Sequence, residues 1–138
     1  MPYNMLIVED SDLVVQKLTK LLEPLEKIRI DGRASDGYTA VKLIKELHPD
    51  YVILDISLKY GHGIKVLEEI SHFDFKPYVI VLSNLNYQYY RDKCKNLGAM
   101  HFFDKAMEFE KVYDVLNERT KQKSKESSEE PADAASTK

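Results

Sequence analysis

Short runs of apolar residues alternate along this chain with longer segments in which apolar residues recur every three or four positions. The short runs are typical of β-strands, and the longer segments are typical of amphipathic helices. Five strands are expected, at residues 5–8, 28–34, 51–54, 78–82 and 99–104. A helix is expected after each strand, with apolar positions within residues 13–25, 40–47, 66–73, 87–97 and 109–116. The apolar side of the first helix is expected to begin at Leu13, and the last helix is expected to begin near Met107. Five strand–helix units in succession predict an α/β fold in which a doubly wound parallel sheet has right-handed crossovers.

Residues that cap or break helices support these boundaries. Ser11 or Asp10 can cap the first helix. Pro49 disfavours helical geometry at the residue before it, and Gly98 is a common residue at the end of a helix. The third strand, residues 51–54, is apolar at every position, as expected for a central parallel strand that is buried on both faces. The second strand is more polar and is predicted to lie at an edge of the sheet.

Length and composition predict one folded domain followed by a tail. A chain of 138 residues is within the common size of a single domain and can bury a substantial core. From about Lys123 the composition changes to Lys, Glu, Ser, Pro and Ala, without any aromatic residue. Such a segment cannot bury enough apolar surface to offset the entropy lost on ordering it. We therefore expect a domain at residues 1–122 and a disordered tail at residues 123–138.

Charge and apolar content argue against several classes of protein. The net charge is −3 and 31% of the residues are charged, with both signs spread along the chain and no basic stripe for nucleic acid. The longest apolar run, residues 78–82, is far shorter than the ~20 residues that span a bilayer. The N-terminus lacks the basic and apolar regions of a signal peptide, and Cys94 has no second cysteine for an internal disulfide. We expect a cytoplasmic protein.

Polar residues suited to chemistry stand directly after four of the predicted strands. Glu9 and Asp10 follow the first strand, and Asp55 follows the third. Ser83 follows the fourth strand, and Lys105 follows the fifth. Because the carboxyl ends of parallel strands meet at one edge of a sheet, where open α/β folds bind ligands, these side chains should converge. Three carboxylates, a hydroxyl and an ammonium suit a divalent cation and a phosphoryl group.

With these residues in place, residues 4–120 resemble the receiver domains of two-component response regulators. Four shorter motifs are also in register with that family: Ala34-Ser35-Asp36-Gly37, Pro49-Asp50, Gly63 and Gly98-Ala99. The resemblance implies a flavodoxin-like fold, with the five parallel strands in the order 2-1-3-4-5. It also implies that Asp55 accepts a phosphoryl group and that Ser83 and Lys105 bind its oxygens.

The same resemblance assigns a Mg²⁺ site to the acidic residues. Two carboxylates ~4 Å apart repel each other by about 4 kcal/mol at an effective dielectric constant near 20. A small hard cation relieves that repulsion, and Mg²⁺ accepts a few carboxylates while keeping several waters. The resemblance implies that Asp10 binds the ion directly and that Glu9 acts mainly through water. Asp55 and the backbone carbonyl of Ser57 complete the implied set of metal ligands.

The family also carries a switch aromatic three positions before the lysine, which here is Phe102, and this residue is expected to switch together with Ser83. The neighbouring Phe103 points to the opposite face of its strand, so one of the two is expected in the core. Because Phe102 lacks a hydroxyl, its inward rotation on phosphorylation has no hydrogen bond to support it. On the preceding helix, which receivers use for partners, Tyr89 is expected to be exposed. The residues at core spacing on that helix are Tyr87, Tyr90, Cys94 and Leu97.

Two positions depart from the family pattern. The lysine is usually followed by a proline in a cis peptide, and here Ala106 follows Lys105. A cis bond before a non-proline residue costs about 2.5–4 kcal/mol, so a trans peptide is expected. A proline usually stands four residues after the acceptor aspartate, and here Lys59 stands there. We expect differently shaped loops at both positions, without the loss of a catalytic group.

We interpret the chain as a single-domain receiver that takes its phosphoryl group from a histidine kinase or a histidine phosphotransfer protein. Phosphorylation would change the binding of an output partner protein, whose identity the sequence does not reveal. The expected binding surface is the face formed by the fourth helix, the fifth strand and the last helix. Such a protein catalyses only its own phosphorylation and dephosphorylation.

Three alternatives remain open from the sequence. A haloacid dehalogenase-like phosphatase also uses a strand-end aspartate, but it generally needs a second aspartate two residues later, where this chain has Ser57. A degenerate receiver would serve only as a scaffold, and the complete set of site residues argues against it. The chain could also be the receiver fragment of a longer regulator.

Overall fold

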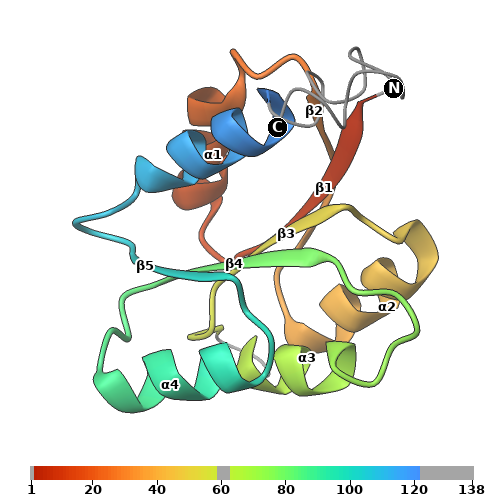
Figure 1. Cartoon of the computed structure of the whole chain (residues 1–138), viewed down its shortest axis with the longest axis vertical. Coiled ribbons are helices and arrows are strands. Elements are labelled where there is room, and N and C mark those ends of the chain that lie inside the picture. The colour runs from red at the N-terminus through yellow and green to blue at the C-terminus, as the bar shows by residue number, and fades with distance from the viewer. Residues whose placement is uncertain (1, 59–62, 122–138) are drawn as a thin grey trace, which may run out of the picture.

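Five parallel strands form one sheet in the order β2-β1-β3-β4-β5 (Figure 1), as the resemblance predicts. The structure is a computed structural model and describes residues 2–58 and 63–121. The strands are β1 Tyr3–Val8, β2 Ile28–Ala34, β3 Tyr51–Leu54, β4 Tyr78–Ser83 and β5 His101–Asp104. The helices are α1 Asp12–Leu22, α2 Gly37–Leu47, α3 Gly63–Ile70 and α4 Gln88–Asn96, and a C-terminal helix covers residues 111–121. The α/β fold is therefore confirmed.

The sheet separates two apolar layers, each covered by its own helices. In Figure 1, α1 and the C-terminal helix lie on one side of the sheet, and α2, α3 and α4 lie on the other. One layer is built around Leu18 and Leu116, and the other around Ile44 and Leu67, and all four side chains are buried. The central strand β3 is buried at every position and β2 lies at an edge, as predicted. Among the described helices, none combines the length and apolar character needed to cross a bilayer.

The predicted helix boundaries follow from local hydrogen bonds. The Ser11 hydroxyl accepts from the backbone N–H of Val14 at 3.3 Å and so caps α1. His48 ends α2 in a left-handed conformation with φ 45°. Gly98 has φ 106° and follows α4, where a residue without a Cβ adopts the left-handed conformation at no steric cost. The Ser11 cap sets the point at which α1 begins, and the left-handed residues His48 and Gly98 set the points at which the chain leaves α2 and α4.

Three expectations about helices were wrong in detail. Leu13 was placed on the apolar side of α1, but its side chain is 61% exposed because it lies about 140° around the helix from Leu18. Tyr87 was placed in the core, yet it is 68% exposed because it precedes α4 in an extended conformation and does not follow the helical stripe. The last helix was expected from about Met107, but residues 105–110 form turns and the helix begins at residue 111. The predicted tail and Lys59 lie outside the described residues.

Candidate functional site

The three carboxylates predicted to converge lie together at the carboxyl edge of the sheet. One oxygen each from Glu9, Asp10 and Asp55 lies within 4.8 Å of the others. The parallel pairing of β1 with β3 brings them there, because the backbone N–H of Asp55 donates to the carbonyl of Val8 at 3.0 Å. Glu9 and Asp55 are only 2% and 3% exposed. Two buried acids this close to a third create a strongly negative site.

Lys105 enters this acidic site from the end of β5. Its Nζ donates to Asp55 Oδ2 at 3.1 Å and lies 3.0 Å from Glu9 Oε1. Burial lowers the pKa of the Lys105 ammonium, but the charges of Asp55 and Glu9 outweigh burial and hold this pKa above its ordinary value. Burial, and then the charge of Asp55, raise the pKa of Glu9 although Lys105 pulls it down. Within the part of the chain that the structure describes, the ammonium of Lys105 therefore neutralises the acidic cluster only in part.

Among the described residues, three donors hold the Asp55 carboxylate in one orientation. Its Oδ1 accepts from the backbone N–H of Ser57 at 2.9 Å and from the Ser57 hydroxyl at 2.8 Å. Its Oδ2 accepts from Lys105. The contact from the Ser57 hydroxyl was not predicted from the sequence. The metal-ligand role of the Ser57 backbone carbonyl stays a prediction.

Ser83 lies at the same edge, at the end of β4 between β3 and β5. Its side chain is fully buried, and its hydroxyl oxygen accepts from the backbone N–H of Leu85 at 3.0 Å. The backbone carbonyl of Ser83 accepts from the N–H of Lys105 at 3.0 Å. The loop after β4 and the loop after β5 are thus tied to each other directly beside the acidic cluster.

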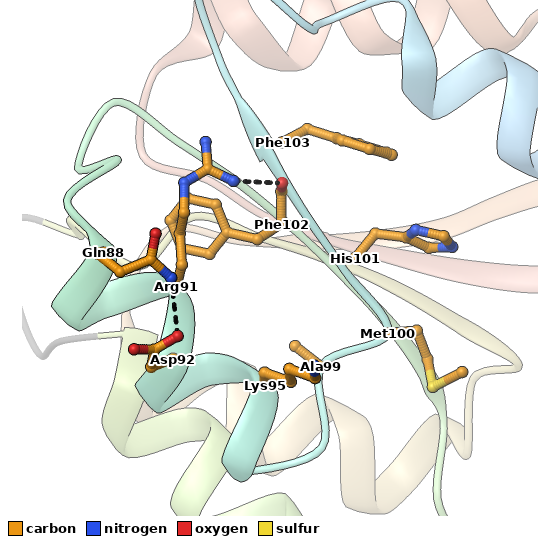
Figure 2. A pocket seen from close by; sticks show the side chains of 9 residues that line it. All are labelled: Gln88, Arg91, Asp92, Lys95, Ala99, Met100, His101, Phe102 and Phe103. Carbon is orange, nitrogen blue, oxygen red and sulfur yellow. Dashed lines mark hydrogen bonds between the residues drawn. The ribbon is translucent and has the colours of Figure 1, made fainter.

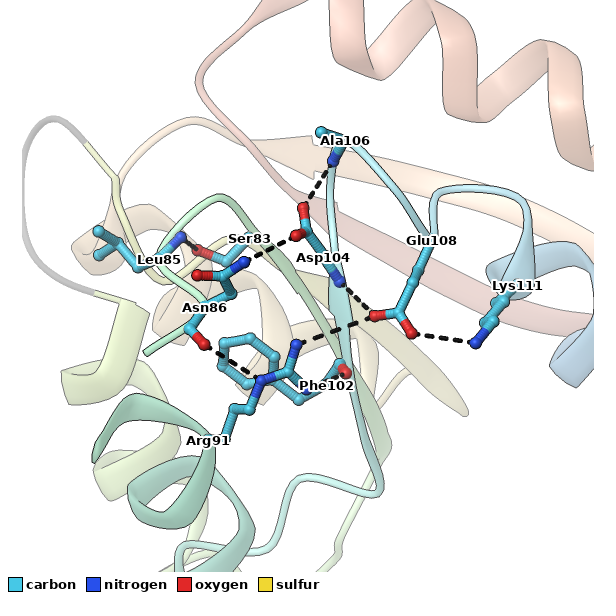
Figure 3. A network of polar contacts seen from close by, with 9 residues as sticks. All are labelled: Ser83, Leu85, Asn86, Arg91, Phe102, Asp104, Ala106, Glu108 and Lys111. Carbon is cyan, nitrogen blue, oxygen red and sulfur yellow. Dashed lines mark hydrogen bonds and ion pairs between the residues drawn. The ribbon is translucent and has the colours of Figure 1, made fainter. Parts of the chain in front are cut away.

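A second set of polar contacts surrounds Asp104, the residue before Lys105 (Figure 3). Asp104 Oδ2 accepts from the side-chain amide of Asn86 at 2.7 Å, and Oδ1 accepts from the backbone N–H of Ala106 at 2.9 Å. The Ala106 N–H has the larger effect and the Asn86 amide the smaller one, and together they hold the pKa of Asp104 below its ordinary value. A proline at position 106 has no N–H and could not make this contact. The described residues contain no cis peptide bond, so the predicted trans peptide before Ala106 is confirmed.

The contacts around Asp104 were not predicted from the sequence. One feature of the sequence could have indicated Asp104, because this residue ends a predicted strand directly before Lys105. No feature of the sequence indicated Asn86, because its partner Asp104 lies 18 residues away and their contact depends on how two loops fold.

The two aromatic residues of β5 lie on opposite faces of the sheet, as predicted. Phe102 packs against the layer beneath α4, and Phe103 packs against the layer beneath α1 and the C-terminal helix. Both are half-buried, so neither belongs fully to the core. Cys94 is fully buried, as its core spacing predicts, and burial raises the pKa of its thiol to about 11.

Gly63 supports the Asp55 loop because it has no side chain. A Cβ at position 63 would overlap the carbonyl oxygen of Asp55 and the Cα of Ile56. Gly63→Ala is expected to lower the free energy of unfolding by about 1–3 kcal/mol, since backbone must move to admit the methyl group. Urea unfolding measures the loss. Gly32→Ala is the matched control, because a Cβ there meets only the side chains of Leu6 and Leu47 at 3.4 and 3.7 Å. Equal stability of both variants would contradict the expected overlap.

The fold and this acidic edge define a class of α/β signalling domain, and comparison with known proteins identifies it. Residues 5–117 match the family model described as the response regulator receiver domain. The chain belongs to this family, the receiver domains of two-component response regulators. This assignment favours the receiver interpretation over the haloacid dehalogenase alternative.

Individual relatives agree with the family assignment. The chain is 35% identical to protein CcdB of Bacillus subtilis over 114 residues, which cover 83% of this chain and 94% of that protein. It is 29% identical to chemotaxis protein CheY of Halobacterium salinarum over 118 residues, covering 86% and 97% of the two chains. Among solved structures, it resembles a chain of the CheX–CheY–BeF₃–Mg²⁺ complex from Borrelia burgdorferi, with 34% identity and a TM-score of 0.72, covering 84% of this chain and 90% of that one.

Proposed function

We propose that this chain is a phosphorylation-driven binding switch that accepts a phosphoryl group on Asp55 from a histidine kinase or a histidine phosphotransfer protein. The observation that carries the proposal is the position of the Asp55 carboxylate, which is buried beside Glu9 and Asp10 and bonded to Lys105. A carboxylate held in this way can act as a nucleophile toward phosphorus.

The transfer has one bond made and one bond broken. An oxygen of Asp55 attacks phosphorus, the P–N bond of the donor phosphohistidine breaks, and the departing imidazole takes up a proton. Lys105 would turn from Asp55 to an oxygen of the phosphoryl group, and the Ser83 hydroxyl would donate to another. Catalysis of this kind depends on position and charge rather than on acid–base chemistry by the protein.

The residues present fit a Mg²⁺ ion. Carboxylate and carbonyl oxygens are the ligands that this hard cation prefers, and three carboxylate oxygens lie within 4.8 Å of one another. Asp10 and Asp55 would bind the ion directly, Glu9 would act mainly through water, and Ser57 would offer its backbone carbonyl. Bound Mg²⁺ would offset the charge that accumulates on the carboxylates and the phosphoryl oxygens.

We place the receiver domain at residues 1–122 and assign residues 123–138 no part in phosphorylation. We propose that the protein acts in the cytoplasm and catalyses only its own phosphorylation and dephosphorylation. Its output would be the altered binding of a partner protein.

The direct test is to mix the full chain with Mg²⁺ and acetyl phosphate and to measure its intact mass. The proposal expects the addition of one phosphoryl group, and expects EDTA to prevent it. If no adduct forms with this donor or with a phosphorylated histidine phosphotransfer protein, the chain is not a phosphoryl acceptor.

We further expect phosphorylation to change the face formed by α4, β5 and the C-terminal helix. Ser83 and Lys105 stand beside the elements of this face, so their movement toward a phosphoryl group displaces β5 and the start of α4. Amide NMR spectra with Mg²⁺, recorded with and without the phosphoryl analogue beryllofluoride, should show shifts that reach Tyr89 and Phe102. Shifts confined to the loops around Asp55 would show that the output surface lies elsewhere.

A further inference from the structure

Arg91, in the middle of α4, contacts three separate segments with one side chain. The carbon of its guanidinium lies 4.8 Å from the centre of the Phe102 ring. Its Nη1 donates to the backbone carbonyl of Phe102 at 3.3 Å, and its Nε donates to the backbone carbonyl of Asn86 at 3.2 Å. Its Nη2 lies 3.9 Å from Glu108 Oε1. Figure 2 shows the guanidinium lying across the Phe102 ring in the groove between α4 and β5. We call these contacts the Arg91 bridge.

The partners of the Arg91 bridge lie close in sequence to the two residues proposed to bind the phosphoryl group. Asn86 is three residues after Ser83, and Phe102 and Glu108 are each three residues from Lys105. The partners are also tied to one another, because Asn86 donates to Asp104 and the backbone N–H of Asp104 donates to Glu108 Oε1 at 2.8 Å (Figure 3). Asn86 follows Ser83, whereas Phe102 and Glu108 flank Lys105, so unequal movements of Ser83 and Lys105 would change the spacing of the partners of Arg91.

Phe102 has no hydroxyl, so only packing and the Arg91 bridge can determine its position. A guanidinium over the face of an aromatic ring is an attractive contact, and it strengthens as water is excluded. The Arg91 side chain is only 33% exposed, and its planar group can contact the ring and donate to the strand backbone at the same time. The Arg91 bridge therefore holds both the ring and the backbone of Phe102 from the α4 side of the groove.

We propose that Arg91 is a positioning residue that holds Phe102 and the loop after β4 in the arrangement without a phosphoryl group, and that phosphorylation must break the Arg91 bridge. This inference rests on the proposed function and concerns its regulation. A contact made in only one of two states opposes any ligand that favours the other. Removing the bridge must therefore strengthen the binding of a phosphoryl analogue at Asp55, although Arg91 is not part of that site.

The test is a titration of the full chain with beryllofluoride in the presence of Mg²⁺, followed by amide NMR. Arg91→Ala is expected to lower the apparent Kd by about three- to tenfold, because the population competent to bind increases. In the absence of beryllofluoride, the Phe102 amide of this variant should already be shifted toward its bound position. Arg91→Lys, which keeps the charge but loses the planar group, should lie between the wild type and Arg91→Ala. Lys95→Ala, which alters the same groove about one turn further along α4, should bind like the wild type.

An unchanged or weaker affinity in Arg91→Ala, with native melting behaviour, would overturn the inference. If Arg91→Ala does not fold, Arg91→Lys decides, and an affinity equal to or weaker than that of the wild type overturns the inference. Failure of the proposed function has a different signature. In that case the wild-type chain itself shows no beryllofluoride binding that Asp55→Asn removes, and the inference about Arg91 is overturned with it.

Discussion

Asp55→Asn is expected to abolish the phosphoryl adduct formed with acetyl phosphate and Mg²⁺. The asparagine side chain keeps an oxygen that can accept from Ser57, so the loop should keep its shape. It lacks the carboxylate that forms the acyl phosphate, and its amide oxygen is a much poorer nucleophile. Intact mass measurements over a time course should show the full adduct in the wild type and only background in the variant.

Asp36→Asn provides the matched control for this experiment. Asp36 also stands near the end of a strand at the carboxyl edge of the sheet, but its side chain caps α2 by accepting from the backbone N–H of Thr39 at 2.8 Å. Asparagine caps a helix about as well as aspartate, so this variant should fold and become phosphorylated like the wild type. A phosphoryl group that persists on another residue in Asp55→Asn would show that the acceptor has been assigned wrongly.

Lys105→Met is expected to destabilise the protein strongly in EDTA and much less in millimolar Mg²⁺. When the ammonium of Lys105 is removed, Glu9 and Asp55 remain buried next to each other with less positive charge nearby. Breaking a buried ion pair by removing one partner costs about 3 kcal/mol or more. A divalent cation offsets the same negative charge, so it should bind the variant more tightly than the wild type. Urea unfolding in the two buffers measures both effects.

Lys111→Met is the matched control for the lysine experiment. Its ammonium pairs with Glu108 at 3.0 Å, but the side chain is 56% exposed and an exposed ion pair contributes little to stability. This variant should unfold close to the wild type in both buffers. If Lys105→Met loses the same free energy with and without Mg²⁺, the cation does not replace the charge of Lys105, and the metal site must be placed elsewhere.

Much of the candidate site was predictable because strand-end residues are constrained by the sheet. Once residues 5–8 and 51–54 were recognised as parallel strands, Glu9 and Asp55 had to lie at a common edge. The same reasoning placed Ser83 and Lys105 there. The order of the strands could not be derived in this way, because apolar runs of similar composition do not specify their neighbours. Only the resemblance to the receiver family predicted the order.

Side-chain partners across loops could not be predicted in this way. The bond from Asn86 to Asp104, the contact of Ala106 with the same carboxylate, and the Arg91 bridge all depend on how turns bring distant segments together. Helical spacing also failed at Tyr87, because the spacing argument applies only to residues inside the helix.

The sequence by itself determined the α/β class, the positions of the strands, and the carboxylates, hydroxyl and ammonium that meet at one edge. It could do so because strand and helix periodicities are local and because parallel strands share the direction of their carboxyl ends. The tertiary structure alone decided that Lys105 lies between Glu9 and Asp55, that the Ser57 hydroxyl orients the Asp55 carboxylate, and that Arg91 covers Phe102. These features depend on distances of a few ångströms between residues from different elements, and such distances arise only when the helices and loops have packed against the sheet.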